Sequence, residues 1–151
     1  SLCKPTSEGS ISIQSADSSV PPKFFGNYLS TRYDQKTMIS GMKLMRKLSA
    51  TDALQKIIHT EMSPGKDVKS DAELLEYARL NGETVFHQCG TCRMGDDPAN
   101  SVVDGKLKVR GVYGLRVADA SIFPTIPSGN INAPSIMVGE KAAELILQEN
   151  K

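Results

Sequence analysis

The sequence predicts an α+β fold, with helices and short strands in separate stretches of a chain of 151 residues. Residues 9–13 read Gly-Ser-Ile-Ser-Ile, and this alternation of polar and apolar side chains is typical of a half-buried strand. Residues 102–109 hold two apolar runs around Asp104-Gly105, which predicts a hairpin. Apolar residues recur at helical spacing over 34–48 and again over 132–148, so long helices are expected there.

The helix expected over residues 34–48 carries an apolar stripe. We expect this stripe to fill the core, and it consists of Met38, Met42, Met45 and Leu48. A shorter helix is expected from residue 51 to about 58. His59 follows it. A lone histidine at a helix end usually contacts local carbonyls or solvent, so we assign it no chemistry.

A capping box marks the start of the next expected helix. The hydroxyl of Ser70 and the carboxylate of Glu73 can satisfy backbone donors at a helix start. The residues expected on the buried face are Leu74, Leu75 and Ala78. Asn81-Gly82 tolerates left-handed geometry and is therefore expected to end this helix.

The end of the chain predicts a strand followed by a helix. Residues 115–118 are expected to form a compact apolar strand. Asn132 can cap the last helix, which is expected to run to about Gln148. The residues expected on its apolar face are Val138, Ala142, Leu145 and Ile146.

Composition excludes several classes of partner. The formal charge is +1 with acids and bases interspersed, so we expect no nucleic-acid partner. The apolar runs are too short for a membrane-spanning segment, and none is expected in this chain. Three cysteines favour a reducing compartment, which points to the cytoplasm. Ser1 is no initiator residue, so we expect the chain to begin within a longer protein, whose missing N-terminus leaves the localisation undetermined.

The segment from His87 to Gly95 reads His-Gln-Cys-Gly-Thr-Cys-Arg-Met-Gly and permits several interpretations. A zinc site needs four ligands, but Cys3 and His59, the other candidates beside Cys89 and Cys92, lie far off without ligand spacing, so no metal is expected. A thioredoxin-like Cys-x-x-Cys pair would open a helix, whereas Arg-Met-Gly-Asp-Asp-Pro follows here. The residues alone leave His87 as either a core histidine or a site residue.

Two runs of residues resemble the C-terminal region of glucose-methanol-choline (GMC) flavoprotein oxidoreductases. The first is His87-x-x-Gly90-Thr91-Cys92-Arg93-Met94-Gly95, and the second includes Gly114-Leu115-Arg116-Val117-x-Asp119-Ala120-Ser121-x-x-Pro124 and Gly129-Asn130-x-Asn132-Ala133-Pro134-Ser135. The likeness is strong over residues 85–147 and looser over 1–84. The Gly-x-Gly-x-x-Gly run that such proteins use to bind a dinucleotide does not occur in this chain.

The resemblance implies a fold and a division into domains. Residues 1–110 would belong to a substrate-binding domain with a mixed or antiparallel sheet and helices. Residues 111–151 would supply the last strand and helix of a Rossmann-like FAD-binding domain. The rest of that domain would come from a missing N-terminal part of the same protein, and the fragment by itself is expected to be inactive.

The resemblance also implies an activity and its residues. An alcohol would be oxidised to a carbonyl, with FAD as cofactor and oxygen or another compound as electron acceptor. His87 would act as base and Asn132 would hold the alcohol oxygen, so both are expected to be catalytic. The residues expected to contact FAD are Asp119, Ala120, Asn130, Asn132 and Ala133.

Two other functions compete with alcohol oxidation. Some flavoproteins of the same fold resemble this chain but, like hydroxynitrile lyases, cleave cyanohydrins without net redox chemistry. A non-catalytic binding module built on the Cys and His residues is the alternative from another class. For Asp119, a carboxylate that only caps a turn is the alternative to cofactor contact.

Overall fold

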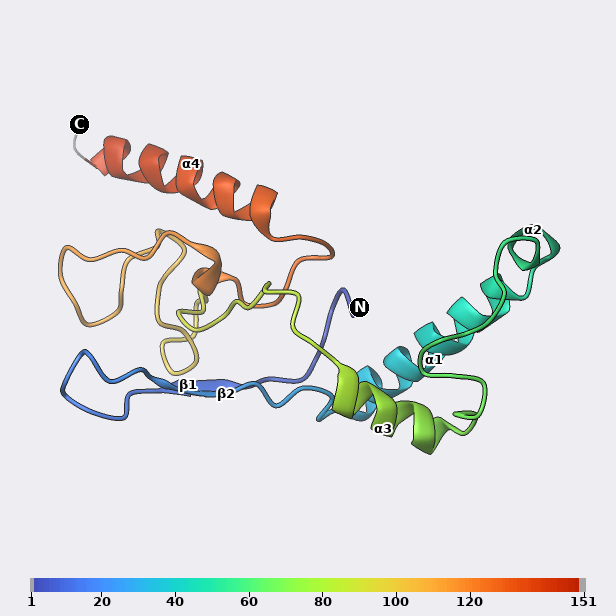
Figure 1. Cartoon of the computed structure of the whole chain (residues 1–151). Helices are drawn as coiled ribbons and strands as arrows, with labels where there is room; N and C mark the ends of the chain where they lie inside the picture. Colours follow the sequence, from blue (N-terminus) through green and yellow to red (C-terminus); the bar gives the residue numbers. More distant parts are fainter. Residues whose placement is uncertain (1, 150–151) are drawn as a thin grey trace. The chain divides into compact units, whose positions relative to one another are not determined.

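The computed structural model describes residues 2–149 and divides into two compact units, residues 1–84 and 85–151. The described elements are β1 (Ser10–Ser12), β2 (Lys23–Phe25), α1 (Arg32–Ser49), α2 (Asp52–Gln55), α3 (Asp71–Asn81), the 3-10 helix η1 (Ala120–Ile122) and α4 (Asn132–Glu149) (Figure 1). Helices with a small antiparallel sheet confirm the α+β class. None of the helices within residues 2–149 is long and apolar enough to cross a membrane.

The first unit contains a two-stranded antiparallel ribbon. β1 pairs with β2 in a register that joins Ser10 to Phe25 and Ile11 to Phe24. The strand expected over residues 9–13 is confirmed, whereas β2 was missed because only three residues follow the Pro-Pro loop before the chain turns. The expectation of half-burial is wrong for this chain. Every residue of both strands is exposed, with Phe24 at 72%.

Helix α1 confirms the long helix expected in the first unit, but its buried face is not the expected one. Ile39 is buried, whereas Met45 is 62% and Leu48 45% exposed. Met38 and Met42 are half-buried. Since α3 is the helix that packs along α1, the face turned towards α3 sets the buried positions. The prediction that the methionine stripe fills the core is therefore wrong for the C-terminal half of the stripe, Met45 and Leu48.

The buried carboxylate of Asp34 ties the N-terminal segment to the start of α1. Its oxygens accept hydrogen bonds from the backbone N–H of Thr6 and of Ser7, both at 2.8 Å, and from both hydroxyls. The backbone N–H of Asp34 itself donates to Thr31 Oγ1, which caps the helix. Burial alone would raise the pKa of Asp34, but the hydrogen bonds from Ser7 and Thr6 together hold it below its usual value.

The capping box expected for α3 is confirmed. Ser70 Oγ accepts from the Glu73 N–H at 3.2 Å, and Glu73 Oε2 accepts from the Ser70 N–H at 2.8 Å. Leu74 and Ala78 are buried, as expected. The helix ends at Asn81, with Gly82 as its C-cap, as expected, although Gly82 has a φ of −72° and does not use left-handed geometry. Glycine is needed there for a different reason: a Cβ would lie 2.4 Å from the Ala78 carbonyl oxygen.

The short helix α2 of the first unit is shorter than expected. α2 spans only Asp52–Gln55, although the pattern predicted a helix to about residue 58. His59 is exposed, in agreement with the structural interpretation given to it.

The second unit packs a loop-rich layer against helix α4. Its buried core consists of Val103, Leu107, Ile122, Phe123, Val138 and Ala142. α4 confirms the expected last helix, with Val138 and Ala142 buried, Leu145 half-buried and Ile146 42% exposed. Helix α4, which has 18 residues, supplies two of these six core residues. Its packing therefore holds the loop-rich layer that carries the candidate site.

The hairpin and strand expected between residues 102 and 118 are reduced to isolated bridges. Val103 pairs with Val109, and Lys108 pairs with Arg116. Asp104 organises the turn, because its Oδ1 accepts from the N–H groups of Lys106 and Lys108. The turn prediction is confirmed, but this carboxylate competes with a regular ladder and continuous strands do not form.

Candidate functional site

The segment that carries His87 is held by backbone bonds to η1. The N–H of Cys92 donates to the Ser121 carbonyl at 3.0 Å, and that of Met94 donates to the Ile122 carbonyl at 2.8 Å. Gly90 has a φ of +89°, a conformation that favours glycine, so the chain can reverse directly after Cys89. Two stretches distant in sequence are thereby fixed side by side.

His87 and Asn130 are brought together by this arrangement. The side-chain nitrogen Nδ2 of Asn130 lies 2.7 Å from Nε2 of His87. The other ring nitrogen, Nδ1, lies 3.1 Å from the carbonyl oxygen of Phe86. His87 is half-buried and Asn130 is exposed, so the pair lies at the surface of the second unit. The ring is thus oriented at both nitrogens and remains accessible.

Asn132 occupies the first position of α4 rather than the cap that the sequence suggested. The first intrahelical bond runs from the Ser135 N–H to the Ile131 carbonyl at 2.9 Å, which makes Ile131 the capping residue. Asn132 and Ala133 are exposed. Two residues span at most about 7 Å, so the Cα of Asn132 lies within that distance of the Cα of Asn130.

Asp119 caps η1. Its Oδ1 accepts a hydrogen bond from the Ser121 N–H at 2.7 Å, and Asp119 itself is exposed. Ala120 is half-buried and packs against the core of the second unit. The turn-capping alternative for Asp119 is therefore present in the structure. One carboxylate oxygen can cap while the other faces a ligand, so the role in cofactor contact stays a prediction.

The cysteines do not form a metal centre in the part of the chain that the structure describes. Cys3, Cys89 and Cys92 are free thiols, and residues 2–149 contain no group of three or more His, Cys, Asp or Glu side chains suited to a metal ion. Burial raises the pKa of Cys89, and the nearby Arg93 only partly offsets this. A raised thiol pKa disfavours the thiolate, which is the form that binds metal ions.

The residues around His87 fit a flavin. Ile131 has no side-chain oxygen or nitrogen, so no side chain of the capping residue can accept from the first N–H groups of α4. A helix start of this kind favours negative charge, which a reduced flavin carries on its N1–C2=O edge. The exposed amides of Asn130 and Asn132 stand beside it. The first N–H groups of α4 and the side-chain amides of Asn130 and Asn132 would together hold the isoalloxazine part of FAD.

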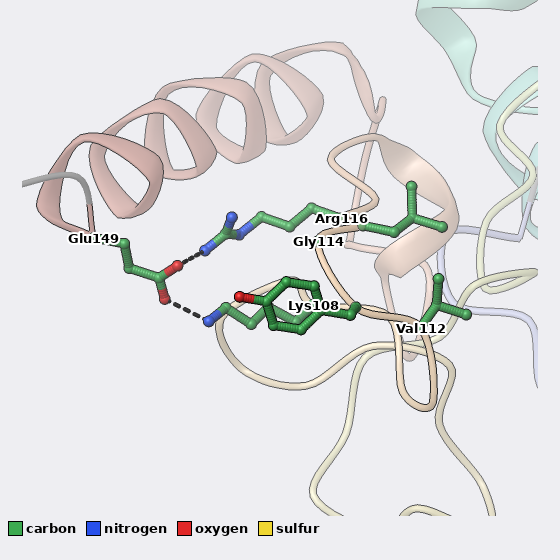
Figure 2. Close-up of a pocket in the computed structure, with 7 residues that line it drawn as sticks. Lys108, Val112, Gly114, Arg116 and Glu149 are labelled. Atoms are coloured by element: carbon green, nitrogen blue, oxygen red, sulfur yellow. Dashed lines mark hydrogen bonds and ion pairs between the residues drawn. The ribbon is translucent and has the colours of Figure 1, made fainter.

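A separate pocket lies at the C-terminal end of α4 and contains none of the predicted site residues among its described lining (Figure 2). Glu149 reaches across it to Lys108 at 2.7 Å and to Arg116 at 2.5 Å. These two cations lower the pKa of Glu149 to about 2. The triad of Glu149, Lys108 and Arg116 therefore lines this pocket and joins the end of α4 to residues 108–116.

Comparison with protein families gives a match over most of the chain. The family model described as GMC oxidoreductase, for the C-terminal region, matches residues 5–139. An alcohol dehydrogenase [acceptor] of Pseudomonas putida is 46% identical over 145 residues, which cover 96% of this chain and 26% of the relative. An oxygen-dependent choline dehydrogenase of Vibrio vulnificus is 43% identical, covering 97% of this chain and 26% of the relative. The chain spans about a quarter of these relatives.

Solved structures show the same fold. A formate oxidase of Aspergillus oryzae, described for its FAD modification, superposes with a TM-score of 0.91 at 33% identity, over 98% of this chain and 26% of that one. A fungal aryl-alcohol oxidase superposes with a TM-score of 0.87 at 34% identity, over 98% and 24%. An FAD-dependent oxidoreductase of Chaetomium thermophilum gives 0.88 at 28%, over 97% and 26%.

Proposed function

Because the chain belongs to the GMC oxidoreductase family, we propose that it forms the C-terminal part of a flavin-dependent alcohol oxidase or dehydrogenase. The enzyme would oxidise the CH–OH group of an alcohol to a carbonyl. The observation that carries the proposal is the accessible pair of His87 and Asn130, joined at 2.7 Å beside the start of α4. The pair offers a basic nitrogen and an amide donor at one place, which suits removal of the proton from an alcohol.

His87 acts as the base in this proposal. The hydroxyl proton must leave as the C–H bond breaks, and an imidazole can take it at Nε2. FAD, when bound, would supply the acceptor for the hydride, at its N5 atom. Precise orientation of the alcohol can lower the barrier by roughly 7–11 kcal/mol. The protein must therefore hold the oxygen as well as remove the proton.

An asparagine amide holds the alcohol oxygen. An amide N–H can donate to a developing alkoxide without competing as a base. The family resemblance assigned this role to Asn132, while the contact with His87 favours Asn130. A donor already within hydrogen-bond reach of the base needs the smallest movement to meet an oxygen bound there. We therefore propose Asn130 as the first candidate and retain Asn132 as the second.

The remainder of the cofactor site would come from sequence beyond this chain. We propose that residues 1–110 complete a substrate-binding domain and that residues 111–151, with Asp119, Ala120 and Ala133, close an FAD-binding domain. A ribbon of two three-residue strands is marginal by itself, which supports further strands pairing with β1 or β2 in the parent protein. Oxygen or another compound would reoxidise the flavin.

Anaerobic mixing of the full-length holoenzyme with primary and secondary alcohols tests the proposal. Bleaching of the oxidised flavin band by at least one alcohol is expected. A flavin that stays oxidised with every alcohol, while a cyanohydrin is cleaved, would instead support the lyase alternative. The names of the relatives, choline and alcohol dehydrogenases, define the first substrates to mix.

A further inference from the structure

The hydrogen bonds at His87 define the position of its proton. The Phe86 carbonyl oxygen, 3.1 Å from Nδ1, can only accept, so Nδ1 must carry the hydrogen. In the neutral ring Nε2 then has no hydrogen and accepts from the Asn130 amide at 2.7 Å. Both contacts are satisfied together only by the neutral Nδ1–H tautomer. The reverse tautomer would leave Nδ1 facing a carbonyl lone pair.

The carbonyl that contacts Nδ1 belongs to a residue with unusual backbone geometry. Phe86 has a φ of +58°, in the left-handed region that bulky side chains rarely adopt. Its side chain is 79% exposed, so burial of the ring does not explain the conformation. Strained residues of this kind persist where the surrounding structure requires them, and they cluster at functional sites. Here the geometry turns the carbonyl of Phe86 towards the following imidazole.

We propose that Phe86 is a positioning residue whose backbone carbonyl fixes His87 as the Nδ1–H tautomer, with the lone pair of Nε2 as the proton acceptor. The assignment of Nε2 as acceptor rests on the proposed function, whereas the tautomer does not. The proton that leaves the alcohol O–H forms the Nε2–H bond, and Nδ1–H continues to donate to Phe86. The Asn130 amide, displaced from Nε2, then donates to the alcohol oxygen.

Nitrogen NMR of the ¹⁵N-histidine-labelled chain tests the tautomer directly and needs neither flavin nor alcohol. Long-range ¹H–¹⁵N spectra at a pH where both histidines are neutral distinguish a protonated ring nitrogen from a bare one. His87 is expected to show a protonated Nδ1 and a bare Nε2. His59, the other histidine of the chain, is exposed in the first unit and serves as the internal reference. A Nε2–H form of His87, or the same mixture as His59, would overturn the proposal.

Variants at two positions separate the contribution of Phe86 from that of Asn130. Phe86→Val, which disfavours the left-handed region, is expected to shift His87 towards the mixture seen for His59. Phe86→Gly accepts that region and is expected to keep the tautomer, so the test does not depend on the folding of the valine variant. Asn130→Ala is also expected to keep it. Retention of the tautomer in a folded Phe86→Val chain, or its loss in Asn130→Ala alone, would contradict the role of Phe86.

The same variants distinguish this role from the proposed function. In the full-length holoenzyme, Phe86→Val is expected to lower the rate of flavin reduction and to alter its pH profile, whereas Phe86→Gly retains the wild-type profile. If the tautomer is as proposed but alcohols never reduce the flavin, the proposed function fails while the positioning role stands. If alcohols reduce the flavin but the tautomer is absent, only the role of Phe86 fails.

Discussion

Asn130 places its amide nitrogen 2.7 Å from Nε2 of His87, although 43 residues separate them in sequence. His87 lies just after the start of the second unit, and Asn130 lies just before α4. Backbone bonds between the His87 segment and η1 bring their stretches of chain together. This contact joins the two motifs on which the proposed function depends.

Replacement of His87 by alanine in the full-length parent should slow flavin reduction by roughly 10²–10⁴-fold, the usual contribution of a positioned base. Stopped-flow absorbance under anaerobic conditions measures this rate. His59→Ala is the matched control and should reduce at the wild-type rate, because that side chain is exposed outside the site. Wild-type reduction in the His87 variant would remove its assignment as base.

Comparison of Asn130→Ala with Asn132→Ala should reveal which amide holds the alcohol oxygen. Loss of one donor to a developing oxyanion typically costs roughly 10²–10³-fold in rate. We expect the larger loss of hydride transfer for Asn130 and a smaller one for Asn132, with FAD retained in both. Reduction kinetics and flavin content of the purified variants measure this. The opposite order would return the role to Asn132.

Replacement of Asp34 by asparagine should destabilise the first unit. The carboxylate is buried and accepts from Thr6 and Ser7, and hydrogen bonds to a charged group contribute about 1.5–3 kcal/mol. Urea unfolding should show a lower midpoint at an unchanged slope. Asp52→Asn, at an exposed position of α2, is the control and should leave the midpoint in place. Equal midpoints for both variants would contradict the anchoring role of Asp34.

The triad at Glu149 should make stability depend on acidity. The folded-state pKa of Glu149 is about 2, below its ordinary value of 4.5, so its contribution is present above about pH 4.5 and is lost towards pH 2. The difference in melting temperature between the wild type and Glu149→Gln should therefore shrink over that range. High salt should also reduce it, since the carboxylate is partly exposed. A difference that is constant with pH would exclude the ion pairs as its cause.

The 151-residue chain alone should bind FAD weakly. In the proposed site, residues of the second unit would contact the isoalloxazine, but the dinucleotide-binding run is not part of this sequence. Titration followed by flavin fluorescence should show no saturation at equimolar FAD, while the full-length parent retains the cofactor. Tight stoichiometric binding by the chain would contradict the proposed division of the site.

Local signals in the sequence located most helices. The Ser70 and Glu73 capping box and the apolar spacing after Asn132 each concern residues within one or two helical turns, so their energetics can be read without the fold. The buried face of α1 could not be read in this way. Burial of Ile39 and exposure of Met45 depend on where α3 packs, which no periodicity within α1 encodes.

Caps and apolar spacing, which are properties of local sequence, were enough to predict an α+β chain, and the order of motifs, through the resemblance to the GMC oxidoreductase family, made His87 the candidate base. Only the tertiary structure decided which amide contacts that base, how its ring is oriented by Phe86, and that Glu149 joins Lys108 and Arg116. These contacts depend on turns of the chain whose directions are set by backbone dihedral angles and by packing. The sequence alone does not specify those directions, so it could not predict which side chains lie together.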